Sequence, residues 1–256
     1  MTAAATTAPS TRRPALDRAA AMRLAADEYQ RSLDLLRDLS GRDWTRKTAC
    51  PGWDVRAMAG HCLGMAEFAS SVREGARQYL AALRAFERDG GNPTDHLNAL
   101  QIAEHRRLSG DELVERYAEV APRAARSRRR RPALLRARSM GAVLLPDGTR
   151  ERWTFGFMLD TVLTRDQWMH RIDIATATRR TPELTAEHDG VLVADVVAEW
   201  AGRHGEPCSL TLDGPAGGRW TFGSGGPELS FDAVEFCRIT SGRGDGEGLM
   251  ETPVAF

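Results

Sequence analysis

The chain has few cysteines, no excess charge of either sign and no long apolar run. Its four cysteines, Cys50, Cys62, Cys208 and Cys237, are widely spaced with no CxxC pair. This argues against a cysteine-based zinc knuckle and fits a reduced, cytoplasmic setting. The 35 basic and 35 acidic residues give a formal net charge of zero, so we expect neither nucleic acid nor an acidic membrane as a partner. No apolar stretch is long enough to span a bilayer.

Signatures of two common enzyme classes are also missing. There is no GxSxG sequence of the kind that carries a nucleophilic serine in α/β-hydrolases. The glycines between positions 214 and 226 are not followed by a lysine at phosphate-loop spacing, and hairpin turns explain them. Residues 1–14 are rich in Ala, Thr and Pro without the apolar core of a secretion signal, so we expect a flexible tail there.

The rest of the sequence predicts a mixed α+β protein. With 256 residues and 42% hydrophobic residues, the chain can bury the core of one large or two modest domains. Apolar residues recur at helical spacing in several segments. These are residues 15–39, a stretch from 55 that can extend to 86, and residues 97–108, 155–179 and 185–203. Ser109, with Glu112 three residues on, predicts the capping box of one more helix.

The pattern changes after Gly205. Three short alternating segments, residues 209–212, 219–222 and 229–231, are separated by glycine-rich turns and predict strands. A last helix is expected over residues 232–240. We therefore expect a helical domain over residues 15–204, followed by a small α+β domain over residues 205–256.

Residues 122–138 are rich in arginine, with four in a row from Arg128 to Arg131. Contact with nucleic acid is one interpretation. A solvated helix face or loop is favoured, because no aromatic residues alternate with the charges. The sequence Pro146-Asp147-Gly148 predicts a turn.

Two helical segments about a hundred residues apart carry potential metal ligands. His61 follows Met58 by three residues and precedes Met65 by four, which places it on the apolar side of its helix. Asp166 and His170 stand one turn apart on the later helix, so both can reach one ion. Two imidazoles and a carboxylate suit zinc, and also iron, nickel or manganese, and leave positions open for water or substrate.

A purely structural interpretation stays open. A histidine on the apolar side of a helix is commonly a hydrogen-bonded core residue, and Asp166 with His170 can be an ordinary helical pair. Asp173 can fix the ring of His170 or simply pair with Arg165 or Arg171. Cys62 is turned about 100° from its neighbour and is expected in the core. Cys50 is expected to pack in the core or a loop, with the mouth of the site as the alternative, and Trp53 and Trp168 are expected to pack the helices, with the lining of the substrate cavity as the alternative. Surface or helix-cap roles are expected for four histidines: His96, His105, His188 and His204.

Three sequence stretches together carry a resemblance to a known family. They are CPGWDVRAMAGHCLG from residue 50, RDQWMHRIDIATATRR from residue 165, and FDAVEFCRITSGRG from residue 231. In this combination and order the chain resembles the mycothiol-dependent maleylpyruvate isomerase family, within the DinB/YfiT-like metalloenzyme superfamily. The resemblance covers most of the chain, from about residue 15 to residue 256.

The resemblance implies an N-terminal DinB-like four-helix bundle that holds one divalent metal, and a C-terminal α+β domain related to sterol-carrier folds. It implies His61, Asp166 and His170 as the metal ligands, although Asp166 stands where the family has a glutamate. It also implies mycothiol, a small actinobacterial thiol, as cofactor, and a functional C-terminal arginine, for which Arg238 and Arg243 are the candidates. An ordinary helix-end cation is the alternative role for either arginine.

These expectations lead to one favoured function and two alternatives. The favoured one is a metal-dependent isomerase or S-transferase that uses mycothiol on a small electrophile, active as a monomer or homodimer. The first alternative is a hydrolase or lyase on the same scaffold that uses metal-activated water instead of a thiol. The second is a non-catalytic module that binds a small ligand.

Overall fold

A computed structural model of the chain describes residues 11–144 and 150–256. The tail expected over residues 1–14 lies mostly outside this range, and so does the turn expected at Pro146-Asp147-Gly148. Within the described part, no helix combines the length and the apolar character that crossing a membrane requires.

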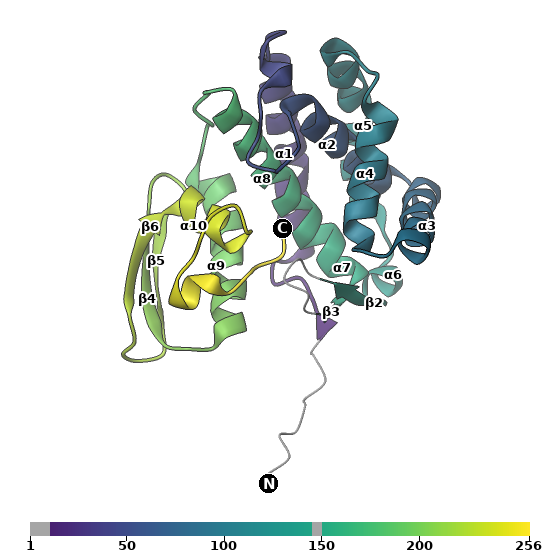
Figure 1. The fold of residues 1–256 in the computed structure, drawn as a ribbon. Helices are drawn as coiled ribbons and strands as arrows, with labels where there is room; N and C mark the ends of the chain where they lie inside the picture. The colour runs from purple at the N-terminus through teal and green to yellow at the C-terminus, as the bar shows by residue number, and fades with distance from the viewer. Residues whose placement is uncertain (1–10, 145–149) are drawn as a thin grey trace.

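Helices dominate the described chain (Figure 1). The longer ones are α1 (Arg18–Arg37), α2 (Val55–Ser70), α3 (Val72–Asp89), α4 (Pro93–His105), α5 (Gly110–Arg130), α8 (Leu163–Ala177), α9 (Val191–His204) and α10 (Ala233–Thr240). The short ones are α6 (Ala133–Arg136) and α7 (Phe155–Phe157). Helices α1, α2, α5 and α8 pack on one another around a shared apolar core that includes Leu33, Met58, Tyr117 and Leu163.

Capping residues set several helix boundaries. The capping box of Ser109 and Glu112 at the start of α5 is confirmed. The expectation that the helix from residue 55 can continue to 86 was wrong. Ser71 has an extended backbone, with φ of −151°, and ends α2, and its hydroxyl accepts a hydrogen bond from the Glu74 amide at the start of α3.

The helix expected over residues 155–179 contains a π-helical segment, Met158–Val162, between α7 and α8. Arg128 lies behind it and donates to the carbonyl of Leu159 and to the hydroxyl of Thr164. The preference for a solvated arginine-rich segment therefore fails for Arg128, which is buried. The partners that satisfy its charged head lie more than thirty residues along the chain, so no local pattern indicates them.

Two small sheets complete the fold. The strands β4 (Cys208–Asp213), β5 (Gly218–Phe222) and β6 (Glu228–Asp232), followed by α10, confirm the strands and helix expected near the C-terminus. They form a sheet in the order β5-β4-β6, antiparallel between β4 and β5 and parallel between β4 and β6. The other sheet, β1-β3-β2, was not predicted. It joins β1 (Thr11–Arg12) and β2 (Ser139–Leu144) to β3 (Arg150–Thr154).

Helix α8 connects the two parts because it is buried on both sides. Leu163 and Ile174 contribute to the core of the four packed helices. Trp168 and Met169 join a second core with residues of α9, the β4-β6 sheet and α10, such as Phe236. The described chain is thus a mixed α+β fold that is mostly helical. The boundary expected at residue 204 stays a prediction.

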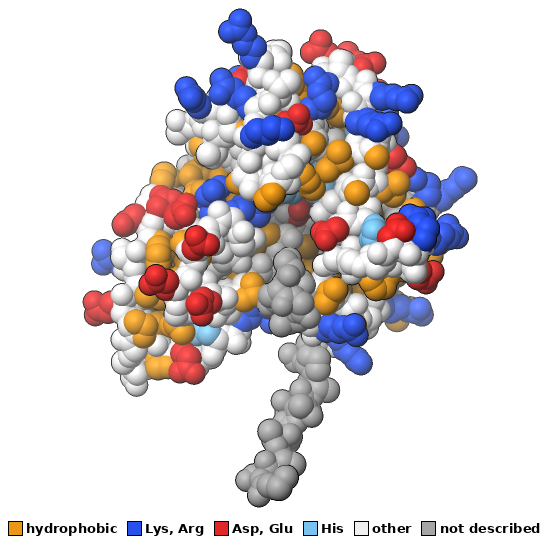
Figure 2. All heavy atoms as spheres, in the orientation of Figure 1, with side chains coloured by type: hydrophobic (Ala, Val, Ile, Leu, Met, Phe, Trp, Pro, Cys, Tyr) orange, Lys and Arg blue, Asp and Glu red, His pale blue; other side chains and the backbone are white. Residues whose placement is uncertain are grey.

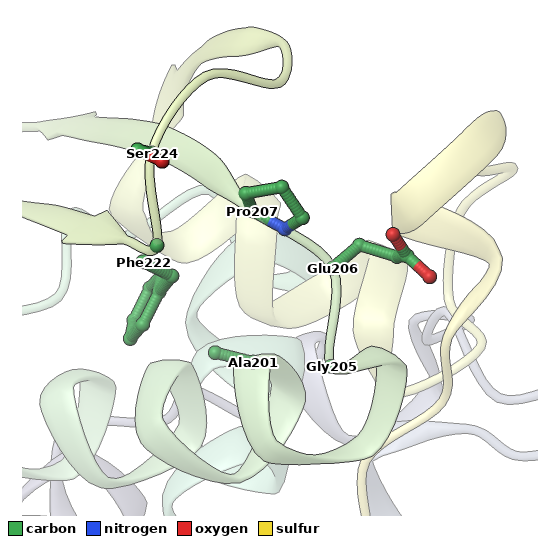
Figure 3. Close-up of a pocket in the computed structure, with 7 residues that line it drawn as sticks. Ala201, Gly205, Glu206, Pro207, Phe222 and Ser224 are labelled. Carbon is green, nitrogen blue, oxygen red and sulfur yellow. The ribbon is translucent and has the colours of Figure 1, made fainter.

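The surface shows how the two parts differ. On the face in Figure 2, basic side chains predominate over the helices at the top and right, and acidic ones over the C-terminal part at the lower left. A shallow hollow of about 320 Å³ lies where the end of α9 meets β4 and β5 (Figure 3). Its described lining residues, among them Gly205, Pro207 and Phe222, include none of the predicted metal ligands, so the candidate site lies elsewhere.

Candidate functional site

Helices α2 and α8 bring the three predicted ligands together. His61 lies on α2, and Asp166 and His170 lie one turn apart on α8. Nε2 of His61 is 3.5 Å from Asp166 Oδ2, and Nε2 of His170 is 3.3 Å from Asp166 Oδ1. One atom from each residue lies within 4.8 Å of the other two. Both imidazoles are buried, whereas the Asp166 side chain keeps 20% of its surface exposed, so the cluster opens to solvent on the side of the carboxylate.

The cluster fits a divalent ion by two observations. Among the described residues, neither ring nitrogen of His61 has a hydrogen-bond partner, although the residue is only 2% exposed. A buried polar atom without a partner costs about 1–3 kcal/mol, so this arrangement calls for a ligand. Metal bonds of about 2.0–2.2 Å at tetrahedral angles place two ligand atoms about 3.4 Å apart. The spacings of 3.3 and 3.5 Å match that distance.

The charges within the cluster favour an ionised Asp166 beside positively charged groups. Burial opposes ionisation of Asp166, but the nearby charges of His170 and His61 prevail and hold its pKa well below the ordinary range. Burial likewise opposes a charged His170, yet the Asp166 carboxylate raises the pKa of that imidazole well above its ordinary value. Without an ion, a proton on His170 compensates the carboxylate, and an ion would replace that positive charge.

Asp173 faces His170 and both candidate arginines. Its carboxylate is buried and lies 3.4 Å from His170 Nδ1. It accepts a hydrogen bond from Arg243 Nε at 2.8 Å, and Arg238 Nη1 lies 3.5 Å from it. Burial raises the pKa of Asp173, but His170 and Arg243 lower it by a larger amount, so the pKa lies below its ordinary value and the group is a carboxylate.

Of the two roles considered for Asp173, the pairing with Arg165 or Arg171 was wrong, whereas its position 3.4 Å from His170 Nδ1 agrees with fixing that ring. Arg165 pairs with Asp195 and Glu199, and Arg171 pairs with Glu28 and Asp189. These partners come from other helices, whereas the sequence suggested neighbours on the same helix.

Cys50 and Trp53, for which packing was favoured over a place at the site, also lie at the cluster. Sγ of Cys50 is 4.0 Å from Asp173 Oδ2 and 3.8 Å from Arg243 Nη2. The Trp53 ring lies over both imidazoles, with centroids 5.1 Å from His61 and 5.8 Å from His170. The sequence feature that could have indicated this position for both residues is the turn before α2. Gly52 in this turn has a φ of +80°, which favours glycine.

Cys50, His170 and Asp173 also have ligand atoms within 4.8 Å of one another. Arg243 donates to Asp173 at 2.8 Å, however, and a guanidinium at this position repels a second cation. Cys62 lies in the core as expected, and burial raises the pKa of its thiol to about 12, so it stays a neutral thiol.

The surface or cap role expected for two other histidines was wrong. His105 is buried 3.2 Å from Glu67, and His188 is buried with Nε2 2.8 Å from Glu28. Both carboxylates lie on distant segments of the chain, so the lack of a partner at local spacing in the sequence is not evidence of exposure.

Comparison with known proteins agrees with this architecture. The family model described as "Mycothiol maleylpyruvate isomerase N-terminal domain" matches residues 25–175, more than half of the chain. Two solved structures are similar, both described as mycothiol-dependent maleylpyruvate isomerase and one of them a histidine-to-alanine mutant. Each has a TM-score of 0.56 and covers 90% of this chain. Identities are 17% for the mutant, with 90% of its chain covered, and 18% for the other, with 92% covered.

At these identities the two structures establish a shared fold and no more. No curated protein matches the sequence. The family model carries the assignment, because its match contains α2, most of α8 and the three candidate ligands. The chain belongs to the mycothiol maleylpyruvate isomerase family.

Proposed function

We propose that the protein is a metal-dependent enzyme that uses mycothiol to isomerise a small electrophilic substrate or to add the thiol to it as an S-transferase. The observation that carries the proposal is the buried His61 ring, which has no hydrogen-bond partner among the described residues and faces Asp166 at the spacing of two ligands of one ion. Family membership supports the choice of thiol and of reaction class.

In this proposal His61, Asp166 and His170 hold the ion. Zinc is the best candidate for two imidazoles and a carboxylate, and nickel, iron and manganese accept the same donors. Asp173 orients His170, because a proton on Nδ1 directed at the carboxylate 3.4 Å away leaves the Nε2 lone pair facing Asp166. When bound, the ion supplies positive charge that favours the thiolate of mycothiol over the thiol.

Arg243 and Arg238 are proposed to serve the substrate. Arg243 Nη2 lies 3.4 Å from His170 Nδ1, so its guanidinium borders the ligand set. Its Nε is engaged by Asp173 at 2.8 Å, which fixes the plane of the guanidinium. A fixed guanidinium presents paired donors to a carboxylate, so we infer that the electrophile carries an anionic group.

Trp53 and Cys62 limit what else can react. The Trp53 ring covers the two imidazoles and keeps water from that side of the ligands. The buried, neutral thiol of Cys62 is not a competing nucleophile. Asp166 is one methylene shorter than the glutamate that the resemblance implies, so an ion held by Asp166 would be drawn toward α8 or would leave room for a bridging water. The likeness of the C-terminal sheet and α10 to sterol-carrier folds remains part of the proposal.

The test is reconstitution with and without thiol. Purified protein is stripped with a chelator, reloaded with zinc, nickel, iron or manganese, and assayed with maleylpyruvate and with other small anionic electrophiles, each with and without mycothiol. The proposal expects turnover only when both metal and mycothiol are present. Metal-dependent turnover without thiol would favour a hydrolase or lyase. Stoichiometric ligand binding with no metal uptake would favour a binding module.

A further inference from the structure

Helix α3 has two apolar faces, and only one is covered. Gly75, Gln78 and Ala82 turn toward the neighbouring helices and are buried. Four larger side chains lie elsewhere on the helix and remain exposed. They are Val72 at 62%, Tyr79 at 40%, Leu80 at 48% and Phe86 at 36%. These four make up most of the large exposed apolar side chains of the described residues.

The exposed face has the spacing of a coiled-coil seam. Val72, Ala76, Tyr79, Leu83 and Phe86 follow one another at steps of four, three, four and three residues. This alternation places all five on one stripe, as the a and d positions of a heptad do. Val72, Ala76, Tyr79 and Phe86 are exposed and Leu83 is half-buried, so the stripe has room for a partner helix.

The flank of the stripe is self-complementary. Arg73, Leu80 and Glu87 are seven residues apart and therefore lie in one row beside the seam. Rotation by a two-fold axis through Leu80 places Arg73 of one copy beside Glu87 of the partner subunit, and Glu87 beside the partner's Arg73. Among the described residues, neither Arg73 nor Glu87 has an ion-pair partner within its own chain. The opposite flank has Gly75 and Ala82, which face the protein itself, and ends at the exposed Asp89.

We propose that α3 is a dimerisation surface and that its occupant is the α3 helix of a second copy, packed antiparallel about Leu80. A row of arginine, leucine and glutamate matches its own inverse, which is the requirement of a two-fold interface. The helix lies at the outer edge of the molecule, on the side away from the β4-β6 sheet (Figure 1). Its main contacts among the described helices and strands are with α2 and α4. A partner helix on the exposed face of α3 therefore leaves α8 accessible.

Sedimentation velocity of the full chain from about 1 to 200 μM tests the proposal. We expect a concentration-dependent dimer, and a monomer for Leu80→Glu, which places two carboxylates on the axis. Glu87→Arg alone turns both ion pairs into repulsive pairs and should raise the dimer Kd at least about tenfold. Arg73→Glu should do the same. The double variant with both changes should return within about threefold of the wild-type value.

Leu134→Glu is the matched control, because Leu134 is 74% exposed and lies outside α3. It should leave the dimer unchanged. All substituted side chains are at the surface, and circular dichroism checks that each variant stays folded. A wild-type monomer throughout the concentration range overturns the proposal. So does a dimer that survives Leu80→Glu, or a double variant as weak as the two single changes combined.

Discussion

Helix α8 contributes residues to two buried charged clusters, and the clusters differ in how many of their polar atoms have hydrogen-bond partners. The candidate site contains His61, whose ring nitrogens both lack partners among the described residues. The second, which we call the closed cluster, consists of Glu28, Arg171, His188 and Asp189. There Arg171 donates to Glu28 and to Asp189, each at 2.7 Å, and one nitrogen of His188 lies 2.8 Å from Glu28.

The comparison shows that burial of a histidine does not by itself indicate function. His188 and His61 are equally hidden, at 4% and 2% exposure. His188 has one nitrogen within hydrogen-bond distance of a carboxylate, whereas His61 makes no hydrogen bond with any described residue and its Nε2 lies 3.5 Å from Asp166. The neighbours His170 and Arg171 are turned about 100° apart on α8, which directs one toward α2 and the other toward α1. One helix thus serves a candidate binding site and a structural ion-pair network.

The largest effect is expected from breaking the closed cluster. Arg171→Ala leaves Glu28 and Asp189 buried without their cation, so the free energy of unfolding should fall by about 3–5 kcal/mol. Urea denaturation measures it. Arg37→Ala, which removes an exposed pair 3.5 Å from Asp34, is the control and should cost less than about 1 kcal/mol. An equal loss of unfolding free energy in the two variants would mean that the closed cluster does not stabilise the packing of α1 on α8.

The candidate site should respond in activity more than in stability. Arg243→Gln removes a positive charge beside the ligand set, so thiol-dependent turnover should fall about 10²-fold while bound metal stays unchanged. Steady-state kinetics and elemental analysis of the same sample measure both. Parallel loss of metal and turnover would assign Arg243 to holding the site together and not to the substrate.

A smaller effect concerns acid stability of the closed cluster. Burial raises the pKa of Asp189, but the Thr185 amide and Arg171 lower it by more, so the pKa lies below the ordinary 3.8. Such a group contributes stability that is present above pH 3.8 and lost as the pH falls through its lowered pKa. Asp189→Asn should therefore flatten the fall of unfolding free energy below about pH 4. If the variant and wild type lose unfolding free energy equally below about pH 4, this carboxylate is not the group that titrates.

The smallest effect is expected from Asp166→Glu, which keeps a carboxylate and lengthens its arm to that of the glutamate that the resemblance implies. Metal affinity should stay within about tenfold of wild type, whereas Asp166→Asn should weaken it about 100-fold or more. Isothermal titration with zinc compares the two. Equal affinities for the glutamate and asparagine variants would show that the carboxylate is not a ligand.

Local features of the fold were predictable from the sequence. The capping box at Ser109 depends on residues three apart, and the strands near the C-terminus on alternation over a few residues. The break at Ser71 is local too, but the apolar stripe that continues into α3 obscures it. The β1-β3-β2 sheet was missed, because β1 and β3 pair across about 140 residues and β1 is two residues long.

The candidate site was predictable only where its spacing is local. Asp166 and His170 stand one turn apart. His61 was joined to them because it lies on the apolar side of its own helix, and the resemblance supported that choice. The ion pair of Arg243 with Asp173 joins residues 70 apart, and that of Arg171 with Glu28 joins residues 143 apart. No periodicity records such contacts. This is why Arg165 and Arg171 were wrong as candidate partners of Asp173, whereas its local neighbour His170 was correctly named. It is also why packing was favoured for Cys50 and the surface for His188.

Metal content is the most direct test of the central claim that a buried histidine with neither ring nitrogen hydrogen-bonded to a described residue distinguishes the site from the closed cluster, where His188 lacks such a partner at Nδ1 only. Elemental analysis compares wild type, His61→Ala, His170→Ala and His188→Ala, each purified after incubation with zinc. We predict about one ion per chain for wild type and His188→Ala, and none for the two site variants. Equal metal in all four proteins, or none in wild type, would contradict the account.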